Sequence, residues 1–370
     1  MIKKLLVLLC ATLLALLVLE AGVRVLGLAP RVRERMHEFD PWLGWRKLPG
    51  VRIEQTPDRG DEYRCTITTN AAGLRDDAIP ETPPAGEKRI LFLGDSFTLG
   101  FTVERKDLFV DLLEQRLRKD GARFECINGG TEGYSTDQCA LFYDKVGSKY
   151  HPDLVIYVFY QNDVYWNLKD SYMGFPKPCF QRAADGTWAP PTAPLIDNGQ
   201  GQPGWRDHFA LLRMFGRPRP PMATIQGSQG AVPLPEEFCV GLKDAPPFVS
   251  DAYAATAGIV AWLKARCAQD HARLALLLVP DKADVYSDDH KKLLAQYKLG
   301  DKDWDRGRPV RELSRIAREL GLPCLDLTPG LVRAAGGTKK LYYDFDRHLT
   351  PDGNAQVTDQ LALQVRGWLP

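Results

Sequence analysis

The stretch Arg89-Ile90-Leu91-Phe92-Leu93-Gly94-Asp95-Ser96-Phe97-Thr98-Leu99-Gly100 contains a compact apolar run that ends at a glycine. Such a run is typical of a strand buried on both faces of a parallel sheet. In an open parallel sheet, ligands bind beyond the carboxyl ends of the strands, so Ser96 is expected at a binding edge. This stretch alone leaves two interpretations open: Ser96 is a nucleophile, or Asp95 or Ser96 only caps the helix that follows.

The same alternation of strand and helix continues along the chain. Further strands are predicted at residues 123–127, 154–159, 274–279 and 323–327, and helices at 107–119, 140–146, 252–268, 310–320 and 353–368. Strands that alternate with helices in units of about 30 residues indicate a parallel sheet covered on both faces. The expected fold class is therefore α/β, a three-layer α/β/α sandwich.

Composition and charge narrow the function classes. The chain has 370 residues, of which 44% are hydrophobic and 26% charged, and its net charge is +1. This balance is typical of a globular protein and argues against a nucleic-acid binder, which normally carries a basic excess. Residues 1–30 contribute +2 of that charge and the remainder −1. The partner of the main body is therefore expected to be neutral, a small molecule or a glycan and not a polyanion, and no nucleic acid is expected.

The N-terminus has the pattern of a membrane segment. Lys3 and Lys4 precede an apolar run from Leu5 to Leu19, Glu20 interrupts it, and weaker apolar character continues to Leu28. Fifteen helical residues extend about 22 Å, short of a hydrocarbon core of roughly 30 Å, whereas a helix continued to Leu28 would span it. Residues 1–30 are predicted to be an uncleaved signal anchor, with a cleaved secretory signal or a buried or interfacial helix as alternatives.

The two orientation signals disagree. Arg24, Arg31, Arg33 and Arg35 outnumber the two lysines on the other side, which alone would place the main body in the cytoplasm. An N-terminal, signal-like segment instead favours export, and export is the prediction.

The main body has two additions to its α/β core. Residues 31–86 are predicted to form a turn-rich preamble, and residues 87–370 the main domain, with an insertion at 164–249 that holds 13 of the 27 prolines. Two interpretations of the aromatic residues in the insertion stay open: they line a cleft that binds a glycan or an acyl group, or they pack the insertion onto the core. These residues are Trp166, Trp188, Trp205, Phe209 and Phe215. Cys179 and Cys239 could form a disulfide across this segment; sequence leaves this open.

Three further polar segments lie at predicted strand ends or near the C-terminus: 128–134, 160–163 and 344–353. The Gly133 N–H, the Asn162 amide and the Ser96 N–H would meet at one sheet edge as donors to a developing oxyanion. His348 lies two residues after Asp346 and can act as a base that a carboxylate orients.

This ordered set resembles the SGNH (GDSL-type) hydrolase superfamily. Gly94-Asp95-Ser96 matches the first block, Gly133 the second, Asn162 with Asp163 the third and His348 the last. The resemblance implies a flavodoxin-like sheet, Ser96 as nucleophile, His348 as general base and Asp346 as its partner. It also implies an oxyanion hole of Ser96, Gly133 and Asn162, with no metal and no organic cofactor.

Two features of the preamble, residues 43–46 and 69–75, are similar to membrane-anchored bacterial SGNH proteins. The expected location is therefore the bacterial cell membrane, with one spanning helix and the catalytic domain on the periplasmic or extracytoplasmic side.

The chain departs from the family pattern twice. Tyr160 stands where the third block usually has glycine, and Phe345 stands three residues before the histidine, where aspartate is usual. Tyr160 is expected to narrow the pocket, and Asp346 to approach from another angle, with Asp344 as the alternative. The Asp-x-His spacing and residues 279–286 are similar to alginate O-acetyltransferase-like members.

Three functions remain possible at this point. The first is a membrane-anchored serine esterase that removes an acyl group, acetyl being the first choice, from a carbohydrate or lipid through an acyl-Ser96 intermediate. The second is an O-acyltransferase that passes the same acyl group to a glycan hydroxyl. The third is a binding protein of this fold with weak catalysis.

Overall fold

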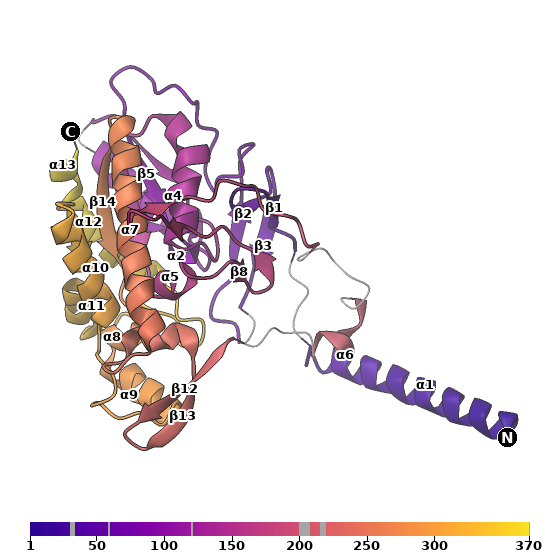
Figure 1. Cartoon of the computed structure of the whole chain (residues 1–370). Helices are drawn as coiled ribbons and strands as arrows, with labels where there is room; N and C mark the ends of the chain where they lie inside the picture. The colour runs from indigo at the N-terminus through magenta and orange to yellow at the C-terminus, as the bar shows by residue number, and fades with distance from the viewer. Residues whose placement is uncertain (30–33, 58–59, 120, 200–207, 215–219, 370) are drawn as a thin grey trace. The chain divides into compact units, whose positions relative to one another are not determined.

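The computed structural model describes residues 1–29, 34–57, 60–119, 121–199, 208–214 and 220–369 (Figure 1). It divides into two compact units, Met1–Arg35 with Asn198–Arg219 and Met36–Asp197 with Pro220–Pro370. Arg31, Arg33, Trp205 and Phe215, which entered the predictions above, lie outside the described residues. The boundaries 1–30, 31–86 and 164–249 stay predictions.

A five-stranded parallel sheet forms the centre of the second unit, in the order β15-β14-β7-β5-β6. The strands are β5 (Lys88–Leu93), β6 (Phe124–Asn128), β7 (Leu154–Phe159), β14 (Arg273–Leu278) and β15 (Cys324–Asp326). Every neighbouring pair is parallel. Each predicted strand agrees with the observed one to within one residue at either end, and the α/β class is confirmed.

Helices cover both faces of the sheet because alternate strand residues point to opposite sides. Leu91, Leu93 and Tyr157 pack on one side with α4 (Thr136–Lys145), α7 (Pro247–Gln269) and α10 (Arg308–Glu319). Ile90, Phe92 and Ile156 pack on the other side. The helices there are α3 (Phe109–Arg118), α11 (Thr328–Ala335), α12 (Pro351–Ala362) and α13 (Val365–Trp368). Figure 1 shows α7 crossing the sheet beside β14.

The helix prediction is wrong at the C-terminus. One helix was expected over 353–368, but the chain forms α12 and then the separate short α13. Short helices without a full apolar repeat were not predicted: α5 (Asn162–Trp166), α8 (Lys282–Val285), α9 (Ser287–Gln296) and α11. Helix α2 (Ser96–Leu99) begins at the expected serine.

The preamble folds into two antiparallel hairpins. Strands β1 (His37–Asp40) and β2 (Gly44–Lys47) form the first, and β3 (Arg52–Gln55) and β4 (Cys65–Thr68) the second. Its residues Leu43, Trp45 and Leu74 belong to the main hydrophobic core. The preamble is thus packed into the second unit.

The described residues of the insertion include short strands and a hairpin. Strands β8 (Ser171–Tyr172), β9 (Phe175–Pro176), β10 (Gln181–Arg182) and β11 (Trp188–Ala189) precede β12 (Met222–Gly227) and β13 (Gly230–Pro235). The 3-10 helix η4 (Glu236–Gly241) follows. Trp166 and Trp188 pack on the main core, as the packing interpretation expects. All eight cysteines, each in the described part, are free thiols, so Cys179 and Cys239 form no disulfide.

Helix α1 (Ile2–Val25) belongs to the first unit and is long and apolar enough to cross a membrane. Its 24 residues extend about 36 Å. Glu20 does not end the helix: it pairs with Arg24 at 2.6 Å and accepts the backbone N–H groups of Ala210 and Leu211, each at 2.8 Å. Those two residues begin α6 (Ala210–Arg213), so the charge inside the apolar segment has partners.

Candidate active site

The candidate site lies where the strand order reverses. The sheet strands, numbered along the chain, follow the order 2-1-3-4-5, and the first and third, β5 and β7, are neighbours. Connections leave these two strands in opposite directions, which opens a crevice at their carboxyl ends. Ser96 follows β5 and Asn162 follows β7, so both side chains lie beside this crevice.

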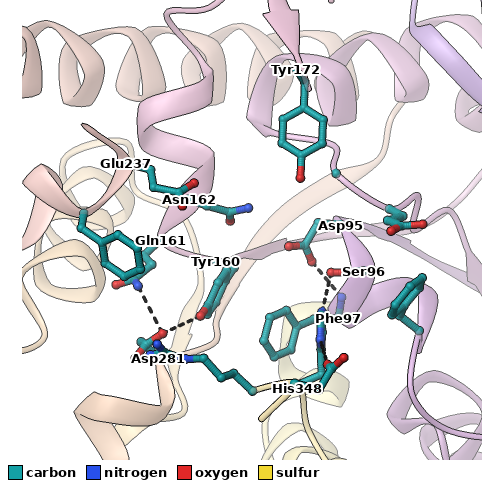
Figure 2. Close-up of a pocket in the computed structure, with 16 residues that line it drawn as sticks. Asp95, Ser96, Phe97, Tyr160, Gln161, Asn162, Tyr172, Glu237, Asp281 and His348 are labelled. Atoms are coloured by element: carbon teal, nitrogen blue, oxygen red, sulfur yellow. Dashed lines mark hydrogen bonds and ion pairs between the residues drawn. The ribbon is translucent and has the colours of Figure 1, made fainter. Parts of the chain in front are cut away.

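Ser96, His348 and Asp346 form a hydrogen-bonded row. Figure 2 shows two of them, Ser96 and His348, on the same side of the pocket. The Ser96 Oγ lies 2.7 Å from His348 Nε2, and His348 Nδ1 contacts an Asp346 oxygen. The His348 ring packs on Phe97, with ring centres 4.7 Å apart. Since the Asp346 carboxylate occupies Nδ1, the ring can present Nε2 to the Ser96 hydroxyl as a proton acceptor.

Asp95 caps α2 and Ser96 does not. The Asp95 carboxylate accepts the Phe97 N–H at 2.9 Å, while the Ser96 hydroxyl faces His348. Burial raises the pKa of Asp95 to about 6, although the Phe97 N–H and nearby His348 oppose the shift. The capping interpretation therefore applies to Asp95 and leaves the Ser96 side chain available for chemistry.

The short Asp-x-His spacing works through an unusual backbone conformation. Arg347, between the two residues, has φ = 71°, a left-handed conformation that costs a non-glycine residue about 1–3 kcal/mol. Its guanidinium is held by an ion pair with Asp281. The turn at Arg347 allows Asp346 to reach His348, whereas Asp344 pairs with Lys340 at 2.5 Å.

Gly133 and Asn162 line the same pocket as Ser96. Gly133 has φ = 76°, and a Cβ there would lie 2.8 Å from the Tyr172 ring, so a side chain is excluded on both counts. The Asn162 carboxamide makes no hydrogen bond with the described residues, which leaves its N–H groups available to a ligand. Asp163 instead points into the core, where it accepts the Tyr157 hydroxyl at 2.6 Å.

The pocket has a volume of about 290 Å³. Its lining residues are Asp95, Ser96, Phe97, Phe101, Glu132, Gly133, Tyr160, Gln161, Asn162, Tyr172, Glu237, Phe238, Asp281, Asp346, Arg347 and His348. Tyr160 forms part of the wall: its ring lies 4.5 Å from that of Phe97, and its hydroxyl donates to Asp281 at 2.6 Å. Asp281 thereby joins the segment after β7 to Arg347.

Arg75 of the preamble supports the helix that carries Ser96. Its side chain is fully buried and donates to the carbonyls of Leu99, Gly100, Thr66 and Val103 at 2.5–2.9 Å. These bonds satisfy carbonyl groups at the C-terminal end of α2. In so short a helix, such carbonyl groups have no partners within the helix itself. The preamble thus fixes the orientation of α2.

Lys47 and Trp45 hold the loop that carries Gly133. The buried Lys47 ammonium donates to the Gly130 carbonyl and, at 2.7 Å, to the Thr131 hydroxyl. Burial lowers the pKa of Lys47 to about 7. The Trp45 indole donates to the Glu132 carbonyl at 3.0 Å.

Glu62 and Tyr63 hold the loop that carries Asp346. The Glu62 carboxylate accepts the N–H groups of residues 344, 345 and 346 at 2.7–3.1 Å. The Tyr63 hydroxyl donates to the second Asp346 oxygen at 2.9 Å. Burial raises the pKa of Asp346, but hydrogen bonds from His348 and Tyr63 outweigh it and hold the pKa below its usual value.

Replacing Tyr63 with phenylalanine is expected to lower kcat about 3–10-fold for a reaction that uses Ser96 and His348, because one donor to the Asp346 carboxylate is lost. The acid limb of kcat/KM should move to higher pH, since the Asp346 pKa rises without that donor. Tyr343→Phe is the matched control: its ring lies 5.3 Å from Tyr63, but its hydroxyl donates to the Thr102 carbonyl. An unshifted pH profile in Y63F would exclude a role for Tyr63 in positioning Asp346.

Asp76, at the end of the preamble, predicts a pH effect on stability. Burial raises its pKa from 3.8 to about 7, opposed by the Asn128 N–H and Arg105. Between roughly pH 4 and 7 the folded chain keeps a proton that the unfolded chain releases, so this contribution to stability is lost as pH rises. The fall in Tm from pH 5 to pH 8 should be a few degrees smaller in D76N than in wild type. Asp77 has a 91% exposed side chain, so Tm in D77N should fall between pH 5 and pH 8 by as much as in wild type. A fall in D76N as large as in wild type would contradict the raised pKa of Asp76.

Several residues that line or support the pocket were not predicted from the sequence. Asp281 lies in the segment 279–286 that was noted for its likeness to acetyltransferases, and this was the available signal. No sequence signal marked Tyr63, Tyr172 or Glu237, because each lies in a polar, turn-rich segment.

Solved structures with a similar fold include TesA, with 11% identity, 76% of this chain and 100% of that chain covered, and a TM-score of 0.41. EstA, a psychrotrophic esterase from Pseudoalteromonas sp., shares 11% identity over 76% and 98% of the two chains, with a TM-score of 0.41. A variant of Axe2, an acetyl xylan esterase from Geobacillus stearothermophilus, shares 12% identity. The match covers 79% of this chain and 99% of that chain, with a TM-score of 0.41. No curated protein matches the chain.

Residues 245–368 match the family described as "SGNH hydrolase-like domain, acetyltransferase AlgX". The matched segment runs from the start of α7 to α13 and includes Asp281, Asp346 and His348. Over these residues, about a third of the chain, the protein is similar to an SGNH hydrolase-like domain.

Proposed function

We propose that this protein is a serine ester hydrolase that removes an acyl group, acetyl in the first instance, from a carbohydrate or lipid. The observation that carries the proposal is the Ser96 Oγ to His348 Nε2 contact of 2.7 Å, with Asp346 on the other ring nitrogen. A nucleophile, a base and an orienting carboxylate in hydrogen-bond reach are the arrangement that acyl transfer requires.

The reaction proceeds in two halves. His348 takes the Ser96 proton as Oγ attacks the ester carbonyl carbon, and Asp346 stabilises the imidazolium that forms. The Ser96 N–H, the Gly133 N–H and the Asn162 amide donate to the oxyanion. Collapse expels the alcohol, which receives the proton from His348 and leaves the acyl group on Ser96. Water then attacks the acyl carbon, with His348 again as base. Collapse of this second tetrahedral intermediate breaks the bond to Oγ, releases the carboxylic acid and returns the proton from His348 to Ser96.

Trapping the intermediate tests this proposal. The full-length chain in detergent is mixed with p-nitrophenyl acetate and quenched in acid, and peptides are analysed by mass spectrometry. The peptide that contains Ser96 is expected to gain about 42 Da, the mass added by one acetyl group. A label on another residue, or none during observed turnover, would contradict the proposed nucleophile.

O-acyl transfer to a glycan hydroxyl is the second candidate. It is favoured by the family match, whose description names an acetyltransferase. Both reactions share acyl-Ser96 and differ in whether water or a sugar hydroxyl attacks it. Adding a glycan acceptor to the turnover assay separates them: transfer predicts acetylated glycan at the expense of free acetate, and hydrolysis predicts acetate alone.

We infer further that α1 anchors the protein in a bacterial membrane, with the catalytic unit on the extracytoplasmic side. The length and apolar surface of α1 support the anchor. The orientation rests on the signal-like pattern of the segment, two lysines followed by an apolar run. Protease treatment of spheroplasts tests it: the catalytic unit should be degraded from outside, whereas protection until lysis would place it in the cytoplasm.

A further inference from the structure

The insertion contributes one wall of the pocket. Tyr172 comes from β8, and Glu237 and Phe238 come from η4, all within the second unit. All three line the same pocket as Ser96 and His348. The insertion therefore supplies groups that touch whatever carries the acyl ester.

The Tyr172 ring is fixed while its hydroxyl is free. The ring stacks on Trp45 at 5.6 Å and meets the edge of Trp166 at 4.7 Å, and Gly133 lies against it. Figure 2 shows the hydroxyl pointing into the space between Asn162 and Asp95. It makes no hydrogen bond within the described residues, and burial raises the Tyr172 pKa, so it stays a neutral donor for a ligand.

Glu237 presents a carboxylate beside it. One Glu237 oxygen accepts the Trp166 indole N–H at 3.3 Å, which holds the side chain at the pocket wall beside Asn162. A carboxylate in this place accepts hydrogen bonds from hydroxyl groups. Glu132 adds a second carboxylate to the lining.

The charge of the lining disfavours an anionic ligand. Five carboxyl side chains line the pocket: Asp95, Glu132, Glu237, Asp281 and Asp346. Among the lining residues, all of them described, Arg347 is the one arginine or lysine, and its guanidinium is already bound by Asp281. A carboxylate brought in by a ligand would meet like charges in a partly desolvated site.

We propose that Tyr172 and Glu237 form a subsite for an uncharged, hydroxyl-rich acyl carrier of about one sugar ring, and that the pocket rejects uronate carriers. The 290 Å³ volume lies at the lower end of small-molecule sites, which suits one ring with a short acyl group. This inference rests on the proposed function and specifies the substrate class of the same site.

Two matched esters test the substrate class. The full-length chain in detergent is assayed with a mono-O-acetylated methyl glucoside and the methyl glucuronide acetylated at the same position. We expect kcat/KM to favour the glucoside at least about tenfold. Equal rates, or a preference for the glucuronide, would overturn the inference.

Variants assign the preference to the subsite. In E237Q the preference for the glucoside should fall about threefold or more, because one carboxylate charge is removed from a nearly unchanged shape. In Y172F the KM for the glucoside should rise about fivefold, with kcat within twofold, because a binding donor is lost. Glu236→Gln is the control, since Glu236 accepts from Tyr165 and Lys169 at 2.7 and 3.1 Å and lies outside the pocket lining. The same change in E236Q and E237Q would overturn the assignment.

A binding measurement separates failure of the subsite from failure of the proposed chemistry. Calorimetric titration of S96A with the two acetylated glycosides needs no turnover. Tighter binding of the glucoside supports the subsite even if no ester is cleaved, in which case the proposed function fails alone. Equal binding, or none, overturns the subsite even if p-nitrophenyl acetate is hydrolysed through Ser96.

Discussion

Ser96→Ala is expected to lower kcat for ester turnover by at least about 10⁴-fold, the largest effect of any single substitution in this chain. Without Oγ there is no atom to form the acyl-enzyme, and His348 at 2.7 Å from that atom has no proton to take. Only the oxyanion donors and substrate binding remain, and these give a small residual rate. Steady-state release of p-nitrophenol by the full-length chain measures the loss.

Ser148→Ala is the matched control, because the Ser148 hydroxyl donates to the Asp144 carbonyl in the 3-10 helix η2 (Gly147–Tyr150), outside the pocket lining. It should keep the wild-type rate. Undiminished turnover in S96A would show that another group is the nucleophile. A wild-type chain that turns over no ester and transfers no acyl group would instead favour a binding protein of this fold.

Asp346→Asn is expected to lower kcat about 10²–10⁴-fold. An asparagine amide can present N–H to His348 Nδ1, which favours the tautomer whose Nε2 carries the proton and cannot accept one from Ser96. It also removes the negative charge that stabilises the imidazolium. Stopped-flow or steady-state ester assays at pH 8 measure the effect.

Asp344→Asn distinguishes the two aspartates that the sequence left as alternatives. Asp344 pairs with Lys340 at 2.5 Å and with Lys282 at 3.6 Å, and it does not contact His348. D344N should therefore change kcat less than about threefold. A larger loss in D344N than in D346N would reverse the assignment of the orienting carboxylate.

The central fold was predictable because its signals are local. Five apolar runs at strand spacing, each followed by a helix-length segment, indicated the parallel sheet, and strand ends placed Ser96 and Asn162 at one edge. A strand buried on both faces needs uninterrupted apolar residues, and few other segments meet that condition. Four of the insertion strands are only two residues long, and β13 carries two prolines, so no periodicity marked them.

The candidate site was predictable in its residue types and only partly in its geometry. Ser96, Gly133, Asn162 and His348 follow the order of a known set of blocks. The partner of His348 was uncertain because the side-chain direction of Asp346 depends on the backbone at Arg347, which adopts φ = 71°. That conformation is held by the Asp281 ion pair, a contact between segments 66 residues apart.

Residue patterns alone were thus sufficient for the class of fold, the nucleophile candidate and the apolar N-terminal helix, since each depends on periodicity or on neighbours along the chain. The supporting contacts of the site needed the folded chain: Tyr63 meets Asp346 across 283 positions, and Tyr172 meets Gly133 from within the insertion. Hydrogen bonds and ring contacts at such separations arise when whole elements pack together, and no local pattern in the sequence encodes which of the many polar side chains will meet.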